Sequence, residues 1–299
     1  MSSHIIVHDP KFRYLSQSNA ALERIATGML WTEGPVYFAQ GDYYLWSDIP
    51  NNRVYQWAVG QTVRVFDEDA NNSNGHTVDL QGRLISCEHL GRRVSRREHD
   101  GSTTVIADAH AGGRLNSPND VVVKSDGSIW FTDPSYGILS DYEGKRSPQE
   151  QGGCYVYCAG HTPDAPRVVA DDFVKPNGLA FSPDESLLYV SDTGVSHDAD
   201  GPHHIRVFDV GDDNTLSNGR VFAVIKSGVS DGFRMDIDGN LWTSCATGVQ
   251  CFNPEGAMLG EILVPEVVSN LCFGGPKKNH LLITATSSVY TIYVAATGC

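Results

Sequence analysis

The sequence predicts an all-β protein, a six-bladed β-propeller with four-stranded blades whose ring is closed by the N- and C-terminal segments. A similar unit recurs six times, at spacings of roughly 40 to 60 residues, a length that suits a propeller blade. Each unit reads as a β-hairpin, because a turn such as SDGS or IDGN separates two runs rich in β-branched and aromatic residues. No segment keeps a helical apolar period over several turns. A β-sandwich is the rival architecture, but it does not account for six similar units.

The repeats differ in clarity. The clearest copies are SPNDVVVKSDGSIWFTD from Ser117, KPNGLAFSPDESLLYVSD from Lys175 and SDGFRMDIDGNLWTS from Ser230, and fainter ones begin at Thr32, Ser73 and Ser269. Two further alternating runs follow each hairpin except the last, where only VYTIYVA remains. We therefore expect the segment near Leu22 to Ala26 to supply the missing outer strand, and residues 1–299 to form one domain.

Composition excludes several partners. The chain has 299 residues and a formal net charge of −14, so its surface repels phosphate backbones and anionic lipids, and we expect neither nucleic acid nor membrane as a partner. The N-terminal residues lack the charged start and apolar run of a secretory signal, which predicts a cytoplasmic protein. Seven cysteines without zinc-knuckle spacing are expected to be small buried residues in a reducing compartment. The oligomeric state cannot be read from the sequence.

The residue that opens the first strand of each unit carries a side-chain oxygen. In a propeller the innermost strands begin at the channel, so these residues are expected to meet there. Such groups are costly to bury together unless a positive charge compensates them. Oxygen donors without His or Cys match a hard cation such as Ca²⁺ or Mg²⁺. Alternatively, Asn, Asp and Gly recur because they begin turns. In chain order the openers are Glu33, Asn74, Asn119, Asn177, Asp231 and Asn270.

The ends of the second strands are predicted to reach the same mouth of the channel. They are Asp48, Glu88 with His89, Asp133, Asp192, Ser244 and Thr286. Acceptors around a polyol and an aromatic face for a sugar ring are common needs of a sugar site, so Glu88, His89, Asp133 and Tyr136 are candidate substrate-binding residues. The alternative interpretation is that carboxylates at strand tips cap turns.

At these residues the chain resembles the family of regucalcin (senescence marker protein), gluconolactonases and luciferin-regenerating enzyme, and most closely the bacterial gluconolactonase branch. The resemblance rests on TEGPVYF, NSPNDVVV, WFTDPSYG, KPNGLAFSPDE, LYVSDT and DGFRMDIDGNLW, in this order between about Trp31 and Thr284. It implies a six-bladed propeller and a lactonase that converts an aldono-1,5-lactone and water to the aldonic acid. It also implies one divalent cation bound by Glu33, Asn177 and Asp231, with Asn119 touching metal or substrate.

The cation expected from this resemblance is Ca²⁺, although Mg²⁺, Mn²⁺ and Zn²⁺ also suit such a site. It would polarise the lactone carbonyl, and Asp231 would transfer the proton of the attacking water. A carboxylate that touches a cation is a weak base, so Asp231 could instead be a ligand only. Regucalcin-type members carry an arginine for the sugar where this chain has Ser117, so other groups must hold the hydroxyls.

Two other functions fit the same residues. Diisopropyl fluorophosphatase resembles this propeller and uses a Glu, Asn, Asn and Asp set, which Glu33, Asn119, Asn177 and Asp231 match, so a phosphotriesterase is the rival enzyme. A non-catalytic calcium-binding propeller is the rival outside enzymes. A Ser-His-Asp hydrolase is disfavoured, because no helix is expected behind a candidate nucleophile.

Overall fold

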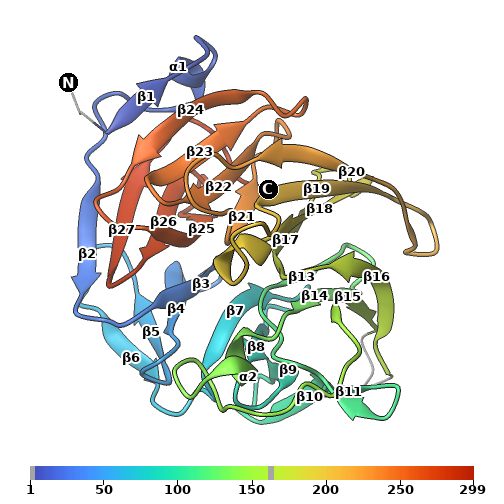
Figure 1. Ribbon diagram of the computed structural model, residues 1–299. Helices are drawn as coiled ribbons and strands as arrows, with labels where there is room; N and C mark the ends of the chain where they lie inside the picture. Colours follow the sequence, from blue (N-terminus) through green and yellow to red (C-terminus); the bar gives the residue numbers. More distant parts are fainter. Residues whose placement is uncertain (1–3, 161–164) are drawn as a thin grey trace.

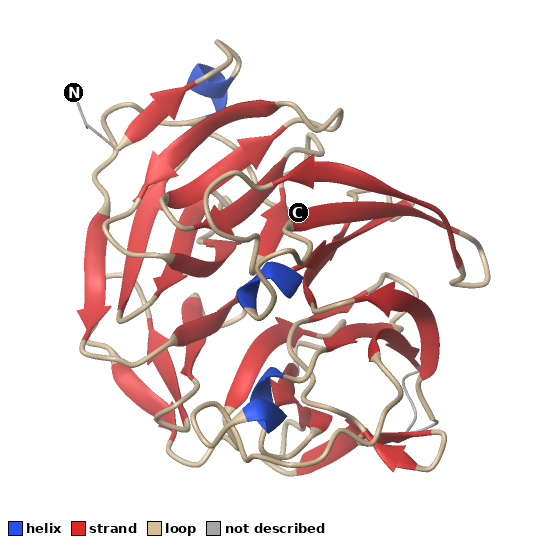
Figure 2. Ribbon diagram, in the orientation of Figure 1, coloured by secondary structure: helices blue, strands red, loops and turns tan. Residues whose placement is uncertain are grey.

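Six antiparallel sheets are arranged as blades around a central axis (Figure 1), so the predicted six-bladed β-propeller is confirmed. The computed structural model describes residues 4–160 and 165–299. In these residues the helices are short: α1 (Phe12–Leu15), α2 (Tyr136–Leu139) and a 3₁₀ turn, Gly194–Ser196 (Figure 2). None of them is long and apolar enough to cross a membrane.

Each of the first three blades takes four consecutive strands, ordered from the channel outward. Blade one is β3 (Thr32–Phe38), β4 (Tyr43–Asp48), β5 (Arg53–Trp57) and β6 (Arg64–Asp67). Blade two is β7 (Ser73–Val78), β8 (Leu84–Glu88), β9 (Arg93–Arg97) and β10 (Thr103–Ala107). Blade three is β13 (Val121–Val123), β14 (Ile129–Asp133), β15 (Cys154–Ala159) and β16 (Arg167–Phe173), preceded by a small hairpin, β11 (Ala109–His110) and β12 (Gly113–Arg114).

The last three blades include both strands from the N-terminal segment. Blade four is β17 (Pro176–Phe181), β18 (Leu187–Asp192), β19 (His204–Val210) and β20 (Leu216–Val224). Blade five is β21 (Phe233–Met235), β22 (Leu241–Cys245), β23 (Gly248–Phe252) and β24 (Met258–Leu263), with β1 (Ile5–Val7) added outside. Blade six is β25 (Val268–Gly274), β26 (His280–Ala285) and β27 (Ser288–Tyr293), completed by β2 (Glu23–Thr27).

The predicted ring closure is confirmed. β2 runs antiparallel to β27, with Ala26 opposite Val289, and lies along the outer edge of the molecule (Figure 1). The fifth strand of blade five was not predicted, because β1 is only three residues long and lies far from β24 in sequence.

The core lies between neighbouring blades. Trp242 of blade five packs in one buried cluster with Leu281 and Ile283 of blade six, and Ile85 of blade two packs with Phe131 of blade three. Burial of about 25 cal/mol per Å² of apolar surface makes these contacts the main force that holds the ring together. The described cysteines are all free, and only Cys299 among them is exposed.

Backbone contacts join the blades at the axis, and they explain the glycines that follow several openers. The amide of Gly178 donates to the Asp231 carbonyl of the next blade at 2.8 Å. A Cβ at Gly178 would lie 2.4 Å from that oxygen. Glycine is needed here for close approach of two blades, in addition to any turn preference.

Candidate metal and substrate site

The strand openers meet, as predicted, around one cavity at one mouth of the channel. Five of the six openers line this cavity of about 310 Å³, and Asn270 lies behind them. β3 presents Glu33, β7 presents Asn74 and β17 presents Asn177, while Asn119 and Asp231 stand just before β13 and β21. The repeat therefore brings together residues that are far apart in the chain.

Glu33 is buried and braced from two sides. Its Oε2 accepts hydrogen bonds from the Gly34 amide at 2.6 Å and from Asn270 Nδ2 at 3.0 Å. Burial raises the pKa of Glu33 well above its usual range, and the negative charge of Asp231 raises it further. The ionised form of Glu33 therefore lacks sufficient compensation from the protein alone.

Asp231 stands in a similar environment. Burial and the charge of Glu143 raise its pKa to about 7, although a hydrogen bond from Asn177 opposes the shift. The charge of the buried Asp120 also raises the pKa of both Glu33 and Asp231. None of the described residues that line the cavity is Lys or Arg. A bound cation would supply the missing positive charge.

The donor set suits a hard cation. Asn74 is buried, and its Oδ1 has no hydrogen-bond partner in the described structure, which leaves an acceptor oxygen at the cavity without compensation. Carboxylate and amide oxygens are the ligands that Ca²⁺ and Mg²⁺ prefer. No cluster of three His, Cys, Asp or Glu that could hold a metal occurs in residues 4–160 and 165–299, so any site here relies on amide oxygens beside its carboxylates.

Two of the predicted substrate-binding residues, Asn119 and Tyr136, line the cavity. The Tyr136 hydroxyl is within hydrogen-bond distance of Thr193 Oγ1 at 2.7 Å and of Ser196 Oγ at 2.9 Å, which fixes its ring at the wall. Burial raises the pKa of this phenol, so it stays protonated.

His89 lies one layer behind the cavity. Its Nε2 is 3.3 Å from Asn74 Nδ2, and its Nδ1 is 3.1 Å from the Glu143 carbonyl oxygen. Burial lowers the pKa of His89 to about 4, so the ring is neutral near pH 7. It positions Asn74 and the segment around Glu143, and it is not among the residues that line the cavity.

Glu88 and Asp133 are not brought to the cavity. Glu88 is occupied within its own blade, where Oε2 accepts from Arg93 Nε at 2.7 Å and Oε1 accepts from the Ser95 hydroxyl. Asp133 accepts the amides of Asn116 and Ser117, each at 2.8 Å. Neither carboxylate is left free for sugar hydroxyls, so we do not carry these two residues into the proposed site.

The contacts of Asp133 recur in other blades. Asp48 accepts the amides of Leu30 and Trp31, and Asp192 accepts those of Val174 and Lys175. In each case the strand-tip carboxylate caps the segment that leads to the opener two residues later. The turn-capping interpretation therefore describes these aspartates, and they set the position of the cavity residues indirectly.

Ser117, where the family resemblance led us to expect an arginine, does not line the cavity. It is fully buried, donates from Oγ to the Pro134 carbonyl at 2.7 Å and accepts the Gly137 amide at 2.9 Å. These bonds hold the start of α2. The segment that follows α2 carries Glu143, which lines the cavity and which the motifs did not indicate. The one available signal was the long connection between β14 and β15, since long ordered loops are often functional.

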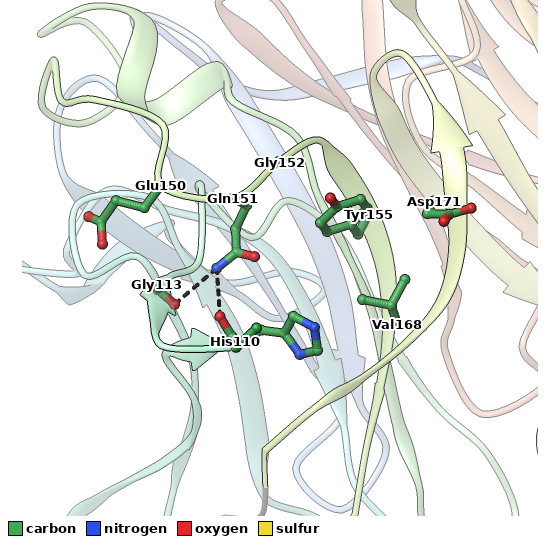
Figure 3. Close-up of a pocket in the computed structure, with 9 residues that line it drawn as sticks. His110, Gly113, Glu150, Gln151, Gly152, Tyr155, Val168 and Asp171 are labelled. Carbon is green, nitrogen blue, oxygen red and sulfur yellow. Dashed lines mark hydrogen bonds between the residues drawn. The ribbon is translucent and has the colours of Figure 1, made fainter.

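A second pocket, of about 340 Å³, lies beside the small β11–β12 hairpin (Figure 3). Gln151 Nε2 donates to the carbonyl oxygens of His110 and Gly113 at 3.1 and 2.9 Å, and Glu150 pairs with Arg92 at 3.0 Å. These contacts anchor the far end of the loop that carries Glu143. None of the predicted site residues lines this pocket.

The fold and the cavity together define the class of this protein. It is a six-bladed β-propeller with carboxylate and amide side chains gathered at one mouth of its channel. The SMP-30/Gluconolactonase/LRE-like region model matches residues 31–287, so the chain belongs to this family, as predicted from its motifs.

The relatives agree with this membership. A gluconolactonase of Zymomonas mobilis subsp. mobilis is 29% identical, over 97% of this chain and 85% of the relative. The solved structure of a gluconolactonase from Xanthomonas campestris is 34% identical, covers 97% of this chain and 94% of its own, and superposes with a TM-score of 0.90. A calcium-binding regucalcin of Agrobacterium tumefaciens shares the fold at 18% identity and a TM-score of 0.76.

Proposed function

We propose that this protein is a lactonase that opens a sugar lactone of the aldono-1,5-lactone type with the help of one divalent cation. The observation that carries the proposal is the convergence of Glu33, Asn177 and Asp231 on one buried, negatively charged cavity. The predicted enzyme class, a lactone hydrolase, agrees with the gluconolactonase names of the relatives over nearly the whole chain.

Glu33, Asn177 and Asp231 would hold the cation, with Ca²⁺ the expected ion and Mg²⁺, Mn²⁺ or Zn²⁺ as substitutes. When bound, the cation polarises the lactone carbonyl and stabilises negative charge on its oxygen. The unpartnered Asn74 oxygen and the raised pKa of both carboxylates support a cation at this place.

The remaining cavity residues would bind and orient the lactone. Asn119 and Tyr136 supply polar contacts from one side, and Trp31, Val229 and Val268 form apolar walls against which the ring can pack. An apolar wall with a few convergent polar groups is the usual composition of a small-molecule site. Asp231 would be a ligand and, as predicted from the family, a candidate for proton transfer.

The test is turnover after metal exchange. The protein would be stripped with a chelator and reloaded with Ca²⁺, Mg²⁺, Mn²⁺ or Zn²⁺ in turn. Hydrolysis of glucono-1,5-lactone and of a fluorophosphate ester would then be followed by acid release. We expect lactone turnover that the chelator abolishes and a divalent ion restores. Turnover of the fluorophosphate alone would favour a phosphotriesterase, and bound metal without either activity would favour a non-catalytic propeller.

A matched pair of variants sharpens this test. Asp231→Asn keeps the shape of a cavity side chain but removes its charge, and we expect it to abolish turnover. Asp238→Asn makes the same change at an exposed turn of the same blade, at the other end of the β21–β22 hairpin, and should leave turnover intact. Near-normal activity of Asp231→Asn would refute the proposed role of Asp231.

A further inference from the structure

The loop after α2 places Glu143 at the cavity through defined contacts. The Glu143 carbonyl oxygen is 3.1 Å from His89 Nδ1, and the Lys145 amide donates to the Gly137 carbonyl at 3.0 Å. Gly144 packs so closely on this turn that a Cβ there would lie 2.3 Å from the same Gly137 oxygen. Both sides of Glu143 are therefore held by the protein.

The Glu143 carboxylate itself is unengaged. It lines the cavity and is partly buried, yet no hydrogen bond or ion pair of the described residues involves its side-chain oxygens. It thus differs from Glu33, whose Oε2 accepts two hydrogen bonds, and from Asp231, which accepts one from Asn177. Burial raises the pKa of Glu143 to about 7.

Glu143 and Asp231 reach the same cavity from different parts of the ring. Glu143 is tied to blade two, because His89 contacts both its carbonyl and Asn74, whereas Asp231 opens blade five. Both carboxylates nevertheless line the same cavity, and after burial the charge of Glu143 is the largest cause of the raised pKa of Asp231. A lactone held at Asp231 would therefore lie in the cavity that Glu143 also lines.

We propose that Glu143 is a catalytic residue that transfers the proton during lactone opening, an inference that rests on the proposed lactonase function. Its carboxylate removes a proton from water as the water oxygen bonds to the carbonyl carbon and the carbonyl π electrons move to oxygen. When the tetrahedral intermediate collapses, the bond between that carbon and the ring oxygen breaks. Glu143 then returns the proton to the ring oxygen, which leaves as a hydroxyl of the hydroxy acid.

This assignment removes a chemical conflict at Asp231. A carboxylate that coordinates a cation loses basicity, because the positive charge stabilises its ionised form. Glu143 is not one of the three proposed ligands and makes no described hydrogen bond to any of them. Asp231 can therefore hold the cation, while Glu143, which does not coordinate it, transfers the proton.

The test compares Glu143→Gln with Asp141→Asn in the metal-loaded full-length protein. Asp141 lies on the same loop but is exposed and pairs with Lys145 at 2.9 Å, so its variant makes the same chemical change away from the cavity. We expect Glu143→Gln to lower kcat on glucono-1,5-lactone by about 10²–10⁴-fold, with little change in KM or in Ca²⁺ affinity measured by calorimetry. Formate added to Glu143→Ala should restore part of kcat.

Each other outcome counts against the inference. If kcat of Glu143→Gln is no lower than kcat of Asp141→Asn, the proposed role of Glu143 is wrong. The lactonase proposal would still stand in that case, provided that the wild-type protein hydrolyses the lactone. Loss of Ca²⁺ affinity in parallel with kcat would make Glu143 a ligand and also overturns the inference. Absence of lactone turnover by the wild-type protein would overturn both the lactonase proposal and this inference.

Discussion

Asn270 of the last blade donates a hydrogen bond of 3.0 Å from its Nδ2 to Oε2 of Glu33 in the first blade. The same amide is turned so that its Oδ1 accepts the Leu271 amide at 2.8 Å, which fixes its direction. The place where the ring closes is therefore also the place where a proposed metal ligand is oriented. Closure of the propeller and assembly of the site are coupled through this pair.

Replacement of Asn270 by Leu tests that coupling. The change removes the donor to Glu33, so the buried carboxylate loses a compensating contact. We expect Ca²⁺ affinity to fall about 10–100-fold and the free energy of unfolding to fall by about 1–3 kcal/mol. Calorimetric titration and urea unfolding would measure the two effects. Asn279→Leu, which loses a bond to the Val294 carbonyl in the same blade, is the control; equal Ca²⁺ affinities in the two variants would contradict the coupling.

Divalent cations are expected to stabilise the fold. A cation that binds the folded protein alone, at one hundred times its Kd, stabilises it by about 2.7 kcal/mol. Thermal unfolding with chelator and with each of four cations would show a raised Tm for the ion that fits. The double variant Glu33→Gln, Asp231→Asn should show no such shift. A Tm that no ion raises in the wild-type protein would argue against a metal at this cavity.

The strand-tip aspartates are expected to matter for stability more than for chemistry. Asp192 is buried and accepts the amides of Val174 and Lys175, both at 2.9 Å. Its replacement by Ala leaves those donors unpaired, and we expect a loss of about 2–4 kcal/mol in urea unfolding. Asp209→Ala, in the same blade, removes only a partly exposed ion pair with Arg220 and should have little effect. If the two variants unfold at the same urea concentration, the capping role of Asp192 is wrong.

The burial of His76 leads us to expect a lower free energy of unfolding in acid. His76 is fully buried between two serine hydroxyls, each 2.8 Å from a ring nitrogen, and burial lowers its pKa from 6.5 to about 3. Below pH 6.5 the unfolded chain binds a proton that the folded protein does not, so unfolding becomes easier as the pH falls. Above pH 6.5, His76 does not reduce the free energy of unfolding. At pH 5 its burial lowers that free energy by about 2 kcal/mol, and the loss continues to grow towards pH 3.

The measurement for His76 is a difference between proteins, because Asp133 and Asp231 titrate in the opposite direction. Urea unfolding of the wild type and of His76→Gln would be compared from pH 7.5 to pH 5. We expect the advantage of the wild type to shrink as the pH falls. A constant difference across this range would show that His76 is protonated equally in both states.

The sequence by itself determined the architecture and most of the candidate site. Alternating strands with glycine turns, repeated six times, specify blades, since the period of the side chains decides which face of each strand is buried. The openers stand at one position of that repeat, so their meeting at the axis followed from the repeat alone. The closing strand near Leu22 could be predicted for the same reason, because a ring leaves one strand unpaired until another segment completes it.

Only the tertiary structure decided the roles of side chains that depend on neighbouring blades and on loops. Glu88 binds Arg93, whereas Asp133 accepts hydrogen bonds from the amides before β13. Both residues nevertheless occupy equivalent strand-end positions of the repeat. Glu143 reached the cavity from an irregular loop, whose path depends on contacts to His89 and α2. Periodicity encodes the face of a strand, but a loop has no period, so its side chains are placed only by the atoms on which it packs.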